Sequence, residues 1–160
     1  MDKIIIIDFG SQLTKLIARR IRDLGVFSEI ITISEMFKIT DYKNIKGIIL
    51  SGGPSTVIGN KFPNIPKEIY NLNIPILGIC YGLQLITKHF KGKVKVNIKK
   101  REFGRALLFR YKNSLLTKGF FNNNKCKVWM SHQDSVHSLP KGFQKIASTN
   151  ESSMTIIENK

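Results

Sequence analysis

The stretch from residue 74 to residue 90 constrains the fold of this chain most tightly. A short apolar run, Ile74–Leu77, predicts a buried strand, and Leu83–Phe90 predicts a helix with apolar residues at three- and four-residue spacing. Cys80 falls between them, flanked by Gly78 and Gly82. Glycines on both sides of a reactive side chain permit a sharp turn and a close approach of substrate. The pattern parallels the Gly-x-Ser-x-Gly nucleophile elbow, with a thiol in place of the hydroxyl.

Cys80 has two interpretations. A lone cysteine is most often a small, buried structural residue. A helix N-terminus directly behind the sulfur would instead favour the thiolate and offer backbone N–H groups to an oxyanion. The two glycines, the change from strand to helix and the nearby Gln84 favour the nucleophile.

The first half of the chain predicts an α/β fold. The β-branched run Ile4–Ile7 is typical of a parallel strand buried on both faces, and a helix follows that ends at Gly25. Ser11 is in place to cap this helix. Further strands are predicted at 30–33 and 45–50. We therefore expect a three-layer domain with a mostly parallel central sheet, whose functional site lies beyond the carboxyl ends of the strands.

The second half has a different character. Short strands, predicted at 94–98, 106–111, 127–130, 144–148 and 154–157, indicate an antiparallel or mixed extension of the sheet. After Trp129, the segment 131–134 is predicted to form a hydrogen-bonded turn in which Asp134 caps the next segment. No linker or repeat divides the chain, so residues 1–160 are predicted to be a single domain.

Composition limits the possible partners. A net charge of +15 raises the possibility of nucleic-acid binding, yet the strongest basic cluster alternates Lys with Val and Ile, as a strand with one solvated face does. Nucleic acid is therefore not an expected partner. No apolar run reaches the roughly 20 residues of a membrane span. With two cysteines and no metal-type cluster, we expect a cytoplasmic protein without a metal.

The pair Gly52-Gly53, after the predicted strand 45–50, leaves two alternatives open. It is either a loop turn before Pro54 or a shallow anion cradle whose N–H groups lie beside Cys80. A phosphate-binding P-loop is excluded, because no Gly-Lys-Ser/Thr follows.

With these residues in view, the chain resembles the class I (triad-type) glutamine amidotransferases. The signature of that class is Gly-x-Cys-x-Gly-x-Gln, here at residues 78–84. Further stretches, covering nearly the whole chain, resemble the glutaminase part of glutamine-hydrolysing GMP synthetases. They are Asp8-Phe9-Gly10-Ser11-Gln12, Ala18-Arg19-Arg20, Leu50-Ser51-Gly52-Gly53-Pro54, Arg101-Glu102-Phe103-Gly104 and Trp129-Met130-Ser131-His132.

The resemblance implies a role for each matching residue. Cys80 would attack the carboxamide of glutamine, form a thioester and release ammonia. The backbone N–H groups of Gly53 and Tyr81 would form the oxyanion hole. The substrate-binding residues would be Gly52, Gln84, Ser131 and His132. This domain would need no cofactor, whereas an ATP-pyrophosphatase synthetase domain would use ATP and Mg to aminate XMP.

The chain departs from the family pattern in two places. The family's catalytic His, with a Glu two residues later, would follow the region matching 154–157, and His89, His132 and His137 all lie elsewhere. We therefore expect a C-terminally incomplete amidotransferase domain without its synthetase domain, either a glutaminase part or a catalytically dead remnant that still binds glutamine. In addition, Gln133 replaces a usual glycine, which would narrow the pocket.

Overall fold

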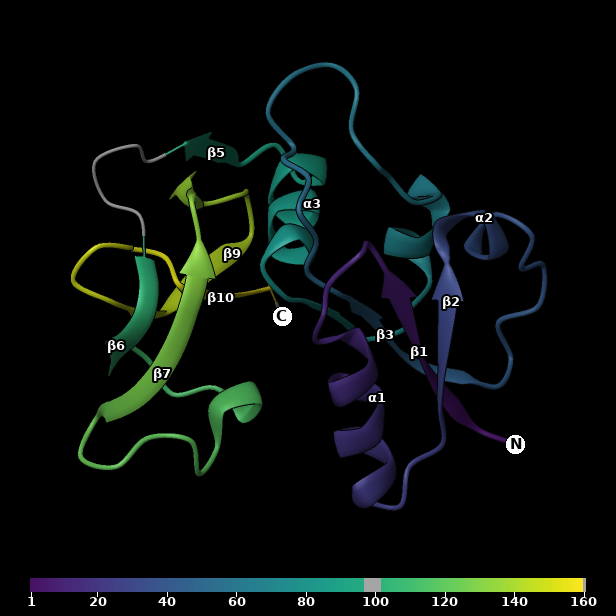
Figure 1. Cartoon of the computed structure of the whole chain (residues 1–160), viewed down its shortest axis with the longest axis horizontal. Coiled ribbons are helices and arrows are strands. Elements are labelled where there is room, and N and C mark those ends of the chain that lie inside the picture. The colour runs from purple at the N-terminus through teal and green to yellow at the C-terminus, as the bar shows by residue number, and fades with distance from the viewer. Residues whose placement is uncertain (97–101, 160) are drawn as a thin grey trace. The chain divides into compact units, whose positions relative to one another are not determined.

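The computed structural model describes residues 1–96 and 102–159, and it confirms an α/β fold with a parallel sheet (Figure 1). These residues form two compact units, residues 1–86 and residues 87–160. Helix α3 (Tyr81–His89) carries the chain from one unit into the other. The first unit contains the parallel sheet and the second contains the antiparallel strands.

The sheet of the first unit has four parallel strands in the order β2-β1-β3-β4. Their bounds are β1 (Lys3–Asp8), β2 (Ser28–Thr32), β3 (Ile45–Leu50) and β4 (Ile76–Gly78). In β1, the consecutive residues Ile5, Ile6 and Ile7 are all fully buried. Since successive side chains of a strand point to opposite faces, both faces of the sheet are covered at β1, as its β-branched run predicts.

Helix α1 (Thr14–Asp23) covers one of these faces. Ala18 lies in a cluster with Ile6 of β1 and Ile49 of β3, with Ile17 and Ile21 packed around them. The sequence predicts an apolar side that includes Ile17 and Ile21, and these two residues do pack there. Three leucines expected on the same side are instead exposed: Leu13, Leu16 and Leu24.

The start of α1 differs from the expectation. The residue at the N-cap is Leu13, which makes no side-chain cap, so Ser11 does not cap the helix. Ser11 Oγ instead accepts a hydrogen bond from the N–H of Leu13 at 3.1 Å, closing a turn before the helix. Thr14 Oγ1 donates to Asp8 Oδ1 at 2.9 Å, which ties the first helical residue to the end of β1.

Two short helical segments complete the first unit. Helix α2 (Ile33–Met36) begins where the sequence predicts the end of a strand, because Thr32 and Glu35 form a reciprocal capping box. The second segment, the 3-10 helix η1 (Lys67–Asn71), lies close to the predicted helical turn at 67–72.

The second unit contains two antiparallel sheets. One has the order β10-β9-β6-β7, and the other is the pair β5-β8. The bounds are β5 (Lys93–Val96), β6 (Glu102–Arg110), β7 (Lys125–His132), β8 (Asp134–Ser138), β9 (Phe143–Ser148) and β10 (Ile156–Asn159). A short 3-10 helix, η2 (Leu115–Thr117), lies between β6 and β7.

Most strands of the second unit coincide with predicted ones, but β8 does not. Asp134, expected to cap a turn, instead begins β8 and pairs with Val96 of β5. Polar residues fill most of this strand, so its sequence lacks the apolar alternation that would mark it. The predicted strand 94–98 is described only as far as Val96, and its remainder lies outside the described residues.

Candidate functional site

Cys80 lies in the sharp turn between β4 and α3, as predicted, and its backbone has a φ of +52°. Such a conformation costs a non-glycine residue roughly 1–3 kcal/mol, so surrounding contacts must hold it. Three backbone hydrogen bonds do so: Ile79 N to Leu50 O at 2.9 Å, Gly82 N to Ser51 O at 3.1 Å, and Gln84 N to Cys80 O at 3.1 Å. The elbow is thus fastened to the end of β3.

The two glycines of the elbow are explained by close backbone contacts. A Cβ atom at Gly82 would lie 2.2 Å from the carbonyl oxygen of Leu50, and one at Gly78 would lie 2.6 Å from the backbone of Gly82. Both distances are far below van der Waals contact, so neither position accommodates a side chain. The spacing Gly-x-Cys-x-Gly is therefore a packing requirement of this turn.

Gly52 and Gly53 lie at the same edge of the parallel sheet. A Cβ atom at Gly52 would lie 3.5 Å from Cβ of Cys80, which places this glycine directly beside the nucleophile candidate. One at Gly53 would lie 2.4 Å from the carbonyl oxygen of Phe9, at the end of β1. The buried Ser51 joins the two loops, since its Oγ accepts from Phe9 N at 3.1 Å. The structure thus brings Gly52, Gly53 and Cys80 together.

Gln84 lies on the first turns of α3 and is almost completely buried. Its Oε1 atom makes no hydrogen bond within the described residues. A buried amide oxygen left unpaired costs roughly 1–3 kcal/mol, and such groups in native proteins normally have a partner. This oxygen is accordingly a candidate to accept a hydrogen bond from a ligand.

Tyr81 is a structural anchor of the elbow. Its side chain is fully buried, its ring packs against Phe9 with centroids 5.0 Å apart, and its hydroxyl donates to the carbonyl oxygen of Pro63. Burial raises the pKa of Tyr81 to about 12, so the phenol is neutral at ordinary pH. Because the side chain is engaged in this way, only the backbone of Tyr81 is left to take part in a reaction at Cys80.

Ser131 and His132 belong to the second unit, where they are the last two residues of β7. Ser131 is exposed, whereas the side chain of His132 is turned inward and retains 16% exposure. His132 Nε2 lies 3.1 Å from Oε2 of Glu102. Sequence reasoning did not single out Glu102 by itself, because the predicted strand began at residue 106 while β6 begins at residue 102.

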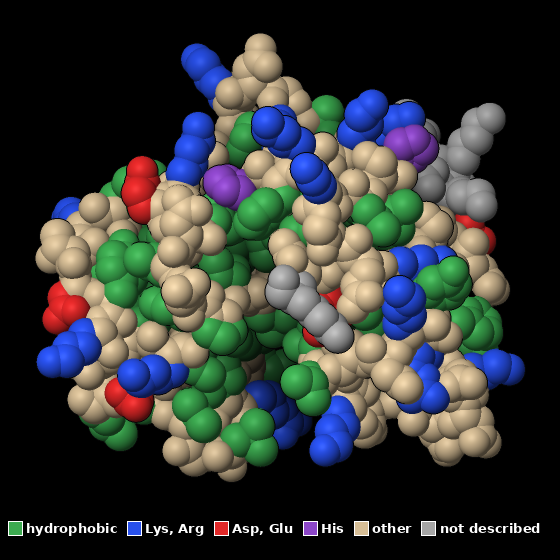
Figure 2. Space-filling view, turned by 180° about the vertical axis from the view of Figure 1, so that it is seen from behind, with side chains coloured by type: hydrophobic (Ala, Val, Ile, Leu, Met, Phe, Trp, Pro, Cys, Tyr) green, Lys and Arg blue, Asp and Glu red, His purple; other side chains and the backbone are tan. Residues whose placement is uncertain are grey.

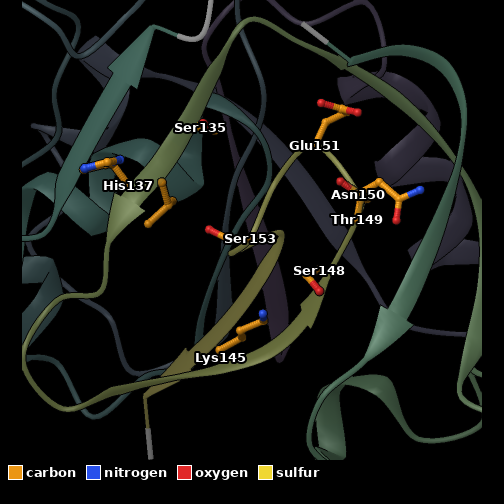
Figure 3. Close-up of a pocket in the computed structure, with 9 residues that line it drawn as sticks. Ser135, His137, Lys145, Ser148, Thr149, Asn150, Glu151 and Ser153 are labelled. Carbon is orange, nitrogen blue, oxygen red and sulfur yellow. The ribbon is translucent and has the colours of Figure 1, made fainter. Parts of the chain in front are cut away.

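A pocket of about 400 Å³ lies wholly within the second unit (Figure 3). It is bordered by β8, β9 and the connection from β9 to β10, and none of its lining residues is a predicted site residue. They are Ser135, Val136, His137, Lys145, Ser148, Thr149, Asn150, Glu151 and Ser153. Lys145 Nζ lies over the ring of Tyr111, 4.8 Å from its centroid, so this ammonium group already has an aromatic partner.

Three further observations concern the molecule outside these sites. Lys and Arg side chains are scattered over the face seen in Figure 2, interspersed with uncharged and hydrophobic ones. In the described part of the chain, no three His, Cys, Asp or Glu residues are grouped so that they could hold a metal ion. None of the helices in that part is long and apolar enough to cross a membrane.

Comparison with known proteins identifies the family. The family model described as "Glutamine amidotransferase class-I" matches residues 5–160, and the chain belongs to this family. Within it, the chain is similar to enzymes named GMP synthase [glutamine-hydrolyzing]. It is 45% identical to that of Brachyspira hyodysenteriae over 160 residues and 50% identical to that of Malacoplasma penetrans over 155 residues, covering 100% and 94% of this chain.

The chain spans only about 30% of the length of these curated relatives, and the matched stretch lies within their glutamine amidotransferase portion. Among solved structures, the chain is similar to a Thermoplasma acidophilum protein described as one subunit of GMP synthase, with a TM-score of 0.81 and 30% sequence identity. The match covers 100% of this chain and 79% of that one. A Thermotoga maritima glutamine amidotransferase, 16% identical with a TM-score of 0.79 over 99% of this chain and 71% of that one, shares the fold.

Gly82→Ala should destabilise the protein. Alanine is favoured over glycine in a helix by up to about 1 kcal/mol, but overpacking of this kind typically costs about 1–3 kcal/mol. We therefore expect a net loss of about 1–2 kcal/mol in the free energy of unfolding, measured by chemical denaturation. Gly47→Ala is the matched control, because its Cβ would meet Ile4 at an ordinary 3.5 Å. Equal stability of the two variants would contradict the packing argument.

Tyr81 should contribute a pH dependence at high pH. Its pKa rises from 10.0 to about 12 on folding, so its contribution to stability is complete below pH 10 and is lost as the pH rises towards 12. Between those values, the free energy of unfolding should fall more steeply with pH for the wild type than for Tyr81→Phe. Urea denaturation at pH 9, 10 and 11 measures this difference, and parallel curves would show that Tyr81 does not contribute.

Proposed function

We propose that Cys80 is the nucleophile of a glutamine amidotransferase reaction. Its sulfur attacks the side-chain carboxamide carbon of glutamine, and the negative charge that develops on the oxygen is held by the N–H groups of Gly53 and Tyr81. The C–N bond then breaks, a proton goes to the nitrogen, and ammonia leaves a thioester on Cys80. Water hydrolyses the thioester to glutamate and restores the thiol.

The observation that carries this proposal is the elbow itself. A non-glycine residue at φ +52°, fastened by backbone hydrogen bonds to β3 and adjacent to Gly52, is a strained and preorganised thiol. The membership of the family supports the same chemistry. The N–H donors of the proposed oxyanion hole come from rigid backbone, which needs little reorganisation during the reaction.

Glutamine is held, in this proposal, by Gly52, Gln84, Ser131 and His132. The buried Oε1 of Gln84 supports a role in accepting a hydrogen bond from the substrate. Ser131 and His132 contribute through their backbone, as the family resemblance implies. The ammonia serves, in the whole protein, an ATP- and Mg-dependent synthetase part that aminates XMP to GMP in the cytoplasm, by analogy with the relatives named GMP synthase.

Glutamine should bind more tightly than asparagine. The asparagine side chain is one methylene shorter, so it cannot reach Cys80 and Gln84 together. Isothermal titration calorimetry with Cys80→Ser, which prevents turnover, should show at least a roughly tenfold preference for glutamine. Gln84→Ala should reduce that preference, whereas the exposed Leu24→Ala should leave it unchanged. Equal affinity for both amino acids would argue against a glutamine site.

Residues 1–160 by themselves should release ammonia from glutamine slowly. The family resemblance places the general base outside these residues, and such groups contribute roughly 10²–10⁴-fold to the rate. The assay compares residues 1–160 with a version extended by the relatives' segment that carries the His and Glu. We expect the extended version to be faster by about that factor and Cys80→Ala to be inactive in both. Equal rates would show that the base lies within residues 1–160, and binding without any turnover in either would favour a glutamine-binding module.

A further inference from the structure

Glu102 is a buried carboxyl group that the chemistry at Cys80 does not use. It begins β6, and its side chain is only 6% exposed. Burial of a carboxylate is unfavourable unless the group is paired or hydrogen-bonded. Oε1 accepts a hydrogen bond from Thr149 Oγ1 at 2.6 Å. Oε2 lies 3.1 Å from Nε2 of His132 but makes no hydrogen bond of acceptable geometry within the described residues, so His132 is the neighbour placed to compensate its burial.

The Thr149 side of this network is itself held firmly. Ser152 N donates to Thr149 Oγ1 at 2.9 Å, and Thr149 N donates to Ser152 O at the same distance. Both residues are buried. The carboxyl group of Glu102 is therefore fastened on one side to a closed turn, which leaves its other oxygen in a defined position towards His132.

His132 lies where the chain leaves one sheet for another. It is the last residue of β7 and is the direct cross-strand partner of Glu102. The chain bends at Gln133 and then enters β8, which belongs to the other sheet. Ser131 and Gln133 are exposed, while His132 points inward to Glu102. The inward side chain of His132 thus lies at this bend, between two exposed residues.

We propose that Glu102 is a positioning residue for glutamine binding: through His132, it fixes the backbone of residues 131–133. This inference rests on the proposed function, which assigns the backbone of Ser131 and His132 to the substrate. It also assigns the imidazole of His132 to anchoring the bend, through the approach of Nε2 to Glu102.

The test uses a chloroketone analogue of glutamine. The Cys80 thiolate displaces chloride, so that an S–C bond forms as the C–Cl bond breaks, and neither the hydrolytic base nor a second domain is needed. The concentration that gives half-maximal inactivation reports binding, and the maximal rate reports the reactivity of the thiol. Mass spectrometry of the labelled peptide verifies that Cys80 is the residue modified.

Glu102→Ala should raise the half-maximal concentration about tenfold, the size of coupling expected within one buried network, and leave the maximal rate within about twofold. Glu102→Gln keeps the shape of the side chain and the hydrogen bond from Thr149 Oγ1, so we expect only about a threefold rise in the half-maximal concentration. This variant replaces Glu102→Ala in the test if the alanine variant does not fold. His132→Ala should behave like Glu102→Ala, and the double variant should be no worse than either single one. Glu68→Ala, at an exposed glutamate of the first unit, is the control and should match the wild type.

Three results would overturn the inference, and they are distinguishable. An unchanged half-maximal concentration in both Glu102 variants would show that the carboxyl group does not position the substrate. A fall in the maximal rate at unchanged half-maximal concentration would place Glu102 and His132 in the activation of the thiol. Failure of the wild-type chain to be labelled at Cys80 would instead overturn the proposed function, and this inference with it.

Discussion

The candidate site depends on the backbone contact between the elbow and the end of β3. The hydrogen bonds from Ile79 N to Leu50 O and from Gly82 N to Ser51 O bring two loops together that are far apart in the sequence. They also hold Cys80 in a conformation that an isolated peptide would rarely adopt. The backbone strain at Cys80, the proposed nucleophile, is thus balanced by hydrogen bonds of the sheet and the turn, which hold the elbow in this conformation without a ligand.

The sequence predicted those parts of the molecule whose signals are local. Continuous Ile runs predicted the buried parallel strands, and two glycines around Cys80 predicted the elbow. Here the physical cause lies within a few residues: a β-branched run suits a strand, and a close backbone approach excludes Cβ atoms. Helix α2 also has a local signal, the Thr32–Glu35 capping box, but the strand predicted at 30–33 includes its first residue and the helix was missed.

The features that were missed depend on pairing between distant segments. The polar sequence of β8 has no strand signal of its own, and it forms a strand because β5 supplies hydrogen-bonding partners. Two contacts distinguish Glu102 from the other glutamates: His132 is its cross-strand partner, and Thr149, which follows β9, donates a hydrogen bond to it. No local pattern encodes which side chains two strands will place opposite one another, so these contacts needed the structure.

The cross-strand pairing of Glu102 and His132 has a consequence for how the β6–β7 ribbon assembles. The connection between these strands is long and contains η2, so no tight turn dictates their alignment. Sliding β6 by one residue would bring Phe103 opposite His132 and would turn Glu102 outwards and Leu108 into water. Such a slip leaves the imidazole facing an aromatic ring and exposes a core leucine. The contact between Glu102 and His132 and the burial of Leu108 therefore both favour the observed register over its neighbours.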